Sequence, residues 1–168
     1  MNGATCLLVL AGLTSCAPRN AVPPSGDEPA EVSTAATPVV TLERTACFGR
    51  CPVYRISVSP SGEVFYEGRA HVRHLGEARG QVPAERVHAL LSELERAGYF
   101  SFATRYAAAE PACGRYATDL PTAITTVRLN DRSKRIVHDY GCGDAPGALR
   151  VLERRIDEVL NSGQWTGE

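Results

Sequence analysis

The sequence predicts an α+β domain: an antiparallel sheet built from two β-hairpins and flanking strands, with two amphipathic helices packed on one face. Two pairs of alternating apolar segments flank turn-forming residues, and each pair is followed by a helical stripe of apolar side chains. A sheet with one apolar face must have that face covered, and each helix has one apolar stripe that can cover it. This order therefore predicts a hairpin followed by a helix, twice along the chain. We place the single domain at residues 39–166, a length sufficient for its own core.

The first half of the domain contains three segments with the pattern of extended chain. Residues 40–44 alternate apolar and polar side chains, which is typical of a strand. Residues 54–58 and 64–66 place apolar side chains on matching faces, and Ser59-Pro60-Ser61-Gly62 between them has turn-forming residues. We expect a hairpin there, followed by an extended segment over residues 70–82 that its glycines bend.

A first helix is predicted to begin at Pro83 and to end before Gly98. The aromatic residues Tyr99, Phe100 and Phe102 follow it, and we expect them to anchor this segment in the core. The apolar side chains of the helix recur at the spacing of a helix packed on one side: Val87, Leu90, Leu91, Leu94 and Ala97.

The second half repeats the order of hairpin and helix. Residues 125–129 and 136–140 alternate around a turn at 130–133, which predicts the second hairpin. Asp144 is a suitable N-cap for a helix with Pro146 in its first turn. Trp165 is expected to fold back against this helix. The helical stripe consists of Leu149, Leu152, Ile156, Val159 and Leu160, and the helix stops at Asn161-Ser162-Gly163.

The N-terminal segment indicates export and lipidation. An apolar run over residues 7–13 ends in Leu13-Thr14-Ser15-Cys16, the pattern of a bacterial lipobox. We expect residues 1–15 to be a signal peptide and Cys16 to carry the lipid; three acyl chains would make the attachment effectively permanent. Residues 1–15 contain no Lys or Arg, although such segments are normally positive. The alternative is a buried N-terminal strand or helix with an incidental Cys16.

Residues 16–38 predict a lipidated cysteine followed by a Pro/Ala-rich tether that holds the domain off a membrane. Ala17 is not the Asp that commonly retains lipoproteins at the inner membrane, which favours the outer membrane of the cell envelope. The net charge of −1 gives no basic excess for nucleic acid and no polybasic cluster for anionic lipid. We therefore expect membrane attachment through the lipid anchor, with an envelope protein or a small ligand as partner and no nucleic acid.

The domain contains four cysteines: Cys47, Cys51, Cys113 and Cys142. In an exported chain an even number predicts disulfides, and four thiols allow three connectivities. We favour Cys47–Cys51 with Cys113–Cys142. The second bond would pin a long loop to the end of the last hairpin and contribute roughly 3–4 kcal/mol.

Two other interpretations of Cys47 and Cys51 stay open. All four thiolates could hold zinc, although three intervening residues are less usual than two. Soft thiolates also select copper(I), and Cys-x3-Cys-Pro resembles the motif of the Sco copper-delivery proteins. In that family the motif precedes a helix, whereas Pro52 here leads into a strand pattern, so we expect no metal and no cofactor and keep a thiol-based copper or redox factor as the alternative.

Five residues are candidate ligand contacts: Thr118, Asp119, Arg50, His138 and Tyr140. Thr118 and Asp119 lie in a long loop before Pro121, where an Asp binding its own backbone in a turn is the simpler interpretation. Arg50 lies between two cysteines, and its charge would favour a thiolate. His138 alternates with Ile136 and Tyr140, which favours a hydrogen-bonded core histidine over a ligand contact.

No catalytic motif is present: the chain lacks a Ser-His-Asp order, an HExxH motif and a phosphate-binding glycine loop. We therefore expect a non-catalytic binding or interaction module rather than an enzyme.

Several motifs together resemble a bacterial family of envelope lipoproteins catalogued as domain of unknown function 6438. The resemblance covers residues 39–166, and it implies the fold and the cellular address without any mechanism. The motifs are Cys47-Phe-Gly-Arg-Cys-Pro-Val-Tyr54, Tyr66-Glu67-Gly68, Ala97-Gly-Tyr-Phe100, Thr118-Asp-Leu-Pro-Thr122 and Leu152-Glu-Arg-Arg-Ile-Asp157.

Overall fold

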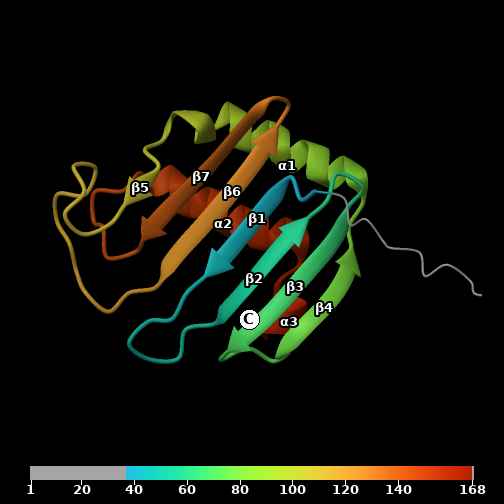
Figure 1. Ribbon diagram of the computed structural model, residues 1–168, viewed down its shortest axis with the longest axis horizontal. Coiled ribbons are helices and arrows are strands. Elements are labelled where there is room, and N and C mark those ends of the chain that lie inside the picture. The colour runs from blue at the N-terminus through green and yellow to red at the C-terminus, as the bar shows by residue number, and fades with distance from the viewer. Residues whose placement is uncertain (1–36, 168) are drawn as a thin grey trace, which may run out of the picture. The chain divides into compact units, whose positions relative to one another are not determined.

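Seven strands form one sheet, and two helices lie against the same face of it (Figure 1). The computed structural model describes residues 37–167, so the predicted signal peptide, Cys16 and nearly all of the predicted tether lie outside the described residues. The strands follow the order β4-β3-β2-β1-β6-β7-β5 across the sheet. The elements are β1 (Val40–Arg44), β2 (Val53–Val58), β3 (Glu63–Ala70), β4 (Gly76–Gln81), α1 (Ala84–Arg96), η1 (Tyr99–Ser101), β5 (Arg105–Tyr106), β6 (Thr122–Leu129), β7 (Arg132–Asp139), α2 (Gly147–Leu160) and α3 (Gly163–Thr166).

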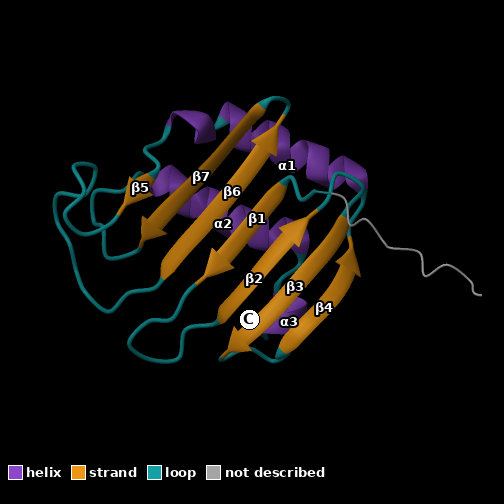
Figure 2. Ribbon diagram, in the orientation of Figure 1, coloured by secondary structure: helices purple, strands orange, loops and turns teal. Residues whose placement is uncertain are grey.

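The predicted α+β class is confirmed, but the sheet is mixed rather than wholly antiparallel. The predicted hairpins are present as β2–β3 and β6–β7, and β1 pairs antiparallel with both β2 and β6. The edge strand β5 pairs parallel with β7, with Arg105 opposite Val137. The chain leaves α1 through η1 and passes down the edge in the direction of β7 (Figure 2). Two residues are too few for an alternating pattern, so β5 could not be predicted from the sequence.

The covered face of the sheet carries the alternating apolar residues that predicted the strands. Val40 and Leu42 of β1 are buried there, with the stripes of α1 and α2 packed over the sheet. Trp165, expected to fold back against α2, stacks on Tyr66 of β3 with ring centroids 4.9 Å apart, so its indole ring packs on the sheet. Gly80 on the neighbouring strand permits this contact, because a Cβ there would lie 2.9 Å from the indole ring.

Two local predictions are wrong. The expected extended segment 70–82 is broken by a loop at residues 71–75, and β4 begins at Gly76, whose φ of +84° suits glycine. Asp144 is not the N-cap of α2. Pro146 occupies that position, two residues further on, and no side chain caps the helix there. The Asp144 carboxylate instead accepts a hydrogen bond of 3.0 Å from the backbone N–H of Arg115.

The opposite face of the sheet is open and polar. Glu43 of β1, Arg55 of β2, and Glu67 and Arg69 of β3 form a cluster of exposed ion pairs on it, which we call the open-face cluster. Among the described residues, no helix is both long enough and apolar enough to span a bilayer.

Candidate functional site

Four loops lie along one end of the sheet, from the left to the bottom of Figure 1, and we call this end of the domain the loop end. They comprise residues 45–52, 71–75, 107–121 and 140–146, and they follow or precede the ends of β1, β2, β3, β4, β6 and β7. Since neighbouring antiparallel strands alternate in direction, each loop here joins elements that the sheet holds in register. The sheet therefore positions the loop end as one surface.

Both disulfides lie at the loop end. The structure pairs Cys47 with Cys51 and Cys113 with Cys142, which is the favoured connectivity, with Cα atoms 5.7 Å and 5.3 Å apart. The second bond ties the 107–121 loop to the 140–146 loop. Backbone hydrogen bonds reinforce that tie, since Ala117 N–H donates to the carbonyl of Gly141 at 2.9 Å.

The two sequence motifs of the loop end contact each other. The backbone N–H of Phe48, inside the Cys47–Cys51 ring, donates to the carbonyl oxygen of Asp119 at 3.0 Å. The Asp119 carboxylate accepts from the hydroxyl of Thr118 at 2.8 Å rather than from its own backbone. Asp119 also has a positive φ of 71°, so its backbone holds an uncommon conformation for a non-glycine residue. The structure therefore brings Thr118, Asp119 and the Arg50 loop together.

Exposed apolar side chains concentrate at the loop end. Phe48 is 90% exposed, although a phenylalanine ring in water costs free energy that burial would recover. Residues 37–167 contain five exposed large hydrophobic side chains, and only Val151 lies elsewhere, on α2. The four in the loops are Phe48, Leu75, Tyr116 and Leu120.

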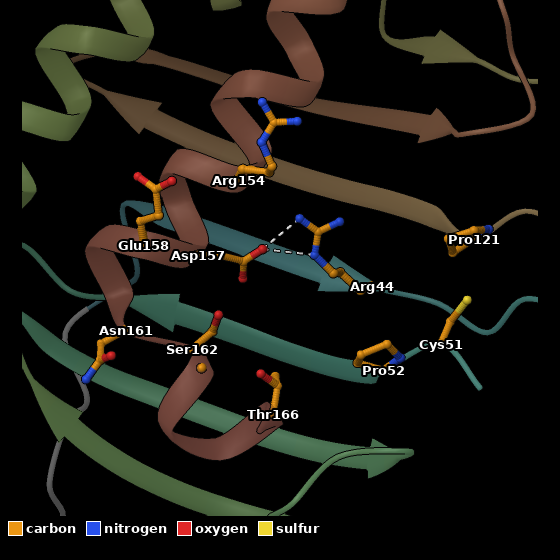
Figure 3. A pocket seen from close by; sticks show the side chains of 11 residues that line it. Arg44, Cys51, Pro52, Pro121, Arg154, Asp157, Glu158, Asn161, Ser162 and Thr166 are labelled. Atoms are coloured by element: carbon orange, nitrogen blue, oxygen red, sulfur yellow. Dashed lines mark hydrogen bonds and ion pairs between the residues drawn. The ribbon is translucent and has the colours of Figure 1, made fainter. Parts of the chain in front are cut away.

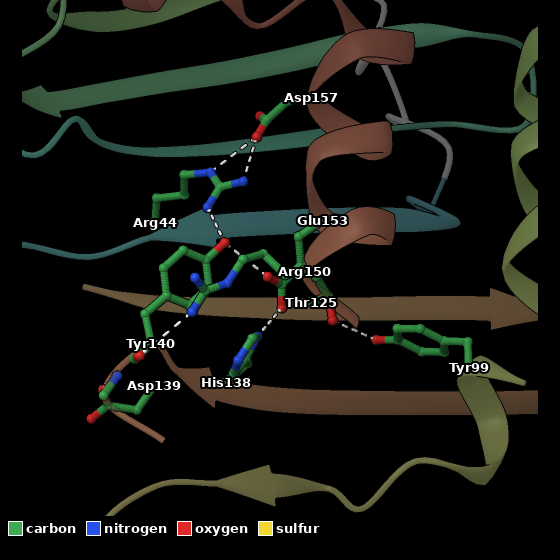
Figure 4. A network of polar contacts seen from close by, with 10 residues as sticks. Arg44, Tyr99, Thr125, His138, Asp139, Tyr140, Arg150, Glu153 and Asp157 are labelled. Atoms are coloured by element: carbon green, nitrogen blue, oxygen red, sulfur yellow. Dashed lines mark hydrogen bonds and ion pairs between the residues drawn. The ribbon is translucent and has the colours of Figure 1, made fainter. Parts of the chain in front are cut away.

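A buried polar network lies behind these loops, between the sheet and α2 (Figure 4). Its first part is centred on Arg44, at the end of β1. The Arg44 guanidinium donates to Asp157 Oδ2 from Nη2 at 2.6 Å and from Nε at 3.0 Å. The Tyr54 hydroxyl donates to the other oxygen of the same carboxylate at 2.5 Å. Asp157 thus joins a strand arginine and a strand tyrosine to α2.

The second part of the network contains two of the predicted contact residues, His138 and Tyr140. Arg44 Nη1 donates to the Tyr140 hydroxyl at 2.8 Å, and that hydroxyl donates to Glu153 Oε2 at 2.8 Å. His138 Nδ1 lies 2.8 Å from Glu153 Oε1. Both His138 and Glu153 are fully buried, so the expected core histidine is present, with α2 supplying its partner.

Burial and the network set the protonation of its members. Burial raises the pKa of Tyr54 above its ordinary value, and the Asp157 charge raises it further. Burial and the Glu153 charge do the same to the pKa of Tyr140. Burial opposes the charge of Arg44, but Asp157, Tyr54 and Tyr140 together more than offset this and raise the pKa of the guanidinium. The tyrosines are therefore neutral donors and Arg44 is a permanent cation at ordinary pH.

A cavity of about 490 Å³, which we call cavity A, opens beside Arg44 (Figure 3). Cys51 and Pro121 from the loops line one side of it, and Arg154 and Asp157 of α2 line the other. Arg154 has no ion-pair or hydrogen-bond partner among the described residues, whereas Arg44 is neutralised by Asp157. Cavity A is therefore lined by side chains of both charges and by one cysteine of the Cys47–Cys51 disulfide.

A second cavity of about 430 Å³, cavity B, lies at the start of α2. His138 and Tyr140 line it together with Arg150, Arg154 and Gly147. The Arg150 guanidinium lies over the Tyr140 ring, 4.2 Å from the ring centroid. Thr118, Asp119 and Arg50 line neither cavity. The five predicted contact residues are thus divided between the loop surface and cavity B.

Sequence reasoning missed Arg44, Glu153 and Asp157 as site residues, although a signal for them exists. Arg44 continues the alternation of Val40 and Leu42, which places it on the covered face. Glu153 follows Leu149 by four residues, and Asp157 follows Glu153 by four, which places both beside the apolar stripe. A charge on a buried face is the sign of a partnered network.

Within residues 37–167 no group of three or more His, Cys, Asp or Glu side chains is placed to hold a metal ion. The family described as Domain of unknown function (DUF6438) matches residues 38–160 of the chain. No curated protein matches it.

Proposed function

This chain belongs to the family of domain of unknown function 6438, and we propose that it is a lipid-anchored, disulfide-stabilised protein of the cell envelope whose loop end is a non-catalytic binding surface. The concentration of exposed apolar side chains at the loop end carries the proposal. Exposed apolar groups gathered in one region are typical of a surface that contacts a partner.

The loops that carry these side chains are held by covalent and backbone contacts. The Cys47–Cys51 and Cys113–Cys142 bonds close two of the loops, and the bond from Phe48 N–H to the Asp119 carbonyl joins them. A surface that is already ordered loses less conformational entropy when it binds. Holding Phe48 in water by such means is consistent with a binding role for its ring, with an envelope protein or a small ligand as partner.

The proposed location at the cell envelope rests on the sequence alone. The lipobox ending at Cys16 and the Pro/Ala-rich residues 17–38 support anchoring by acyl chains at the envelope, and Ala17 favours the outer membrane. Cys16 and residues 17–36 lie outside the described part of the structure. We therefore propose that the protein is attached to the membrane by the acyl chains on Cys16 and not by a surface of the folded domain.

Metabolic labelling with a fatty acid, followed by membrane fractionation, tests the anchor. We expect label on the native chain and none on Cys16→Ser, which should be released or left unprocessed. Cys6→Ser is the matched control, because Cys6 precedes the apolar run and would leave with the signal peptide. An unmodified Met1 at the N-terminus of the native protein would contradict the proposal.

Site-specific photo-crosslinking in intact cells tests the binding surface. A photoreactive phenylalanine analogue in place of Phe48 or Leu120 is expected to give a discrete cross-linked product. The same analogue at Val151 of α2 is the control, because that side chain is also exposed but lies away from the loops. Equal products from Val151, or none from Phe48 and Leu120, would contradict a binding surface at the loop end.

A thiol-based copper or redox factor is the second candidate, favoured by one observation. Cys47 and Cys51 are half-buried, and Cys51 lines cavity A, so a reductant or a metal ion has access to this pair. A strand begins at Val53, directly after it, and no helix N-terminus stabilises a thiolate there. We expect a stable oxidised pair. Stoichiometric copper(I) binding after mild reduction, abolished by Cys51→Ser, would favour this second function instead.

A further inference from the structure

We propose that cavity B binds a small oxyanion that carries a hydroxyl group, as monohydrogen phosphate and 2-hydroxycarboxylates do. The inference deepens the proposed binding role and rests on it, because it names the chemistry of a ligand at the loop end. Three features of the cavity support it: the start of α2, two arginines and one buried histidine nitrogen.

The N-terminus of α2 is free to bind an anion. Pro146 stands at the N-cap, no side chain caps the helix, and its first turn contains no acidic residue. The backbone N–H groups of Gly147 and Ala148, at the first two helical positions, have no carbonyl partner within the helix. A Cβ at Gly147 would meet nothing within 4 Å, so the space in front of these amides is open. Such amides, with the helix dipole behind them, favour an oxyanion.

Two arginines make the cavity cationic. Arg150 and Arg154 both line it, and no carboxylate does, so nothing in the lining neutralises them. Asp144, which is adjacent in sequence, is paired with Arg115 instead. Guanidinium groups bind carboxylate and phosphate by paired hydrogen bonds, so their charge and geometry suit the same ligand class as the helix amides.

His138 supplies an independent sign of a ligand. It is 1% exposed, it lines cavity B, and its Nε2 has no hydrogen-bond partner among the described residues. A buried polar atom without a partner costs free energy, and a bound group would recover it.

The network determines what Nε2 can bind. Glu153 accepts a hydrogen bond from the Tyr140 hydroxyl on one oxygen, and its other oxygen lies 2.8 Å from His138 Nδ1. Because a carboxylate can only accept there, the neutral tautomer that fits this contact has its proton on Nδ1 and a lone pair on Nε2. The lone pair requires a donor. An oxyanion that also carries a hydroxyl meets all three features, with its charge at the arginines and amides and its O–H directed to Nε2.

Titration of the mature chain in detergent micelles, at constant ionic strength, tests the proposal. Inorganic phosphate and lactate are the two probes, because they distinguish a phosphate from a carboxylate source, and acetate is the probe without a hydroxyl. We expect the amide signals of Gly147 and Ala148 and the imidazole nitrogen signal of His138 to shift together with one Kd. Acetate should bind roughly tenfold more weakly than lactate, because it leaves Nε2 without a donor.

Substitutions at the exposed arginines complete the test without disturbing the core. Arg150→Gln and Arg154→Gln should each weaken binding by about tenfold, as expected for loss of one charged hydrogen bond. Arg135→Gln, which removes the same charge from an exposed residue of β7 outside the cavity, should change binding less than about twofold.

Equal weakening by Arg135→Gln, equal binding of acetate and lactate, or no shift at Gly147 and Ala148 would each overturn the inference. None of these results bears on the proposed function by itself. If Phe48 gives cross-links but no probe binds in cavity B, the proposed binding surface stands and the anion site is wrong. If a probe binds in cavity B but Phe48 gives no cross-links, the anion site stands and the binding surface is wrong.

Discussion

Arginine–carboxylate pairs occur on both faces of the sheet, but in different surroundings. In the buried polar network the side chains of Arg44 and Asp157 are 17% and 19% exposed. In the open-face cluster the side chains of Arg69 and Glu67 are 41% and 46% exposed, and water screens them. The number of ion pairs therefore says little about stability here. The pairs on the covered face hold α2 to the sheet, whereas those on the open face contribute little to the free energy of unfolding.

The difference follows from what each pair would do if broken. Removing one partner on the covered face leaves a charge or a hydroxyl that water cannot easily reach. Removing one on the open face leaves a charge that water solvates at once. The two faces should therefore respond differently when one partner of an ion pair is removed.

Asp157→Ala should lower the free energy of unfolding by about 3 kcal/mol. This is a small loss for removing one partner of a buried ion pair, because both side chains keep some contact with water. The variant leaves Arg44 and the Tyr54 hydroxyl without their acceptor. Urea unfolding under oxidising conditions measures the change. Replacing all three polar groups together, as Arg44→Met, Tyr54→Phe and Asp157→Leu, should recover most of the loss. A loss from Asp157→Ala as small as that of an open-face pair would show the two faces to be equivalent.

High pH should destabilise the covered face selectively. The folded-state pKa values of Tyr54 and Tyr99 are raised above the value of about 10 of an unfolded tyrosine, mainly by burial. Their stabilisation is complete below that value and falls as the pH rises, by about 1.4 kcal/mol per pH unit for each tyrosine, because only the unfolded chain releases the proton. Denaturant unfolding from pH 8 to 11 should show this slope. Tyr54→Phe should reduce the slope by the share of one tyrosine, and an unchanged slope would contradict the burial of that hydroxyl.

Tyr99→Phe should cost about 1–2 kcal/mol, because it leaves the buried hydroxyl of Thr125 without its partner. The two hydroxyl oxygens lie 2.6 Å apart on the covered face. Thermal or urea unfolding measures the loss. Adding Thr125→Val removes both polar groups and should restore most of the stability, so a double variant as weak as the single one would speak against a pairwise bond.

Glu43→Gln should cost about 0.5 kcal/mol or less, because the two charges it leaves unpaired, on Arg69 and Arg55, are 41% and 51% exposed and water solvates them. The same urea experiment, repeated at high salt, should reduce even this small difference. A loss comparable to that of Asp157→Ala would mean that the open face is covered by something in solution, and would end the contrast between the faces.

The candidate site could be predicted from the sequence only in part. Alternation in β7 placed His138 and Tyr140 on one face, and the position of His138 in the core followed from that pattern. The contact between Phe48 and Asp119 joins loops that are far apart in the chain, and no pattern in either loop indicates the other. The helical pattern does not single out Arg150 and Arg154 among the polar residues of α2, and only the fold places them in the lining of cavity B with His138.

Most of the local elements could be predicted from the spacing of apolar residues, because that spacing depends on the period of a strand or a helix and needs no distant partner. The sequence indicated both hairpins, both helices and a chemically reasonable cysteine pairing. The tertiary structure alone decided the parallel edge strand β5 and the partners of the buried charges. Arg44 and Asp157 meet across 113 residues of chain, and Glu153 meets His138 only because α2 crosses the sheet at that register. Such contacts depend on how elements pack, and packing is a property of the whole domain rather than of any window of sequence.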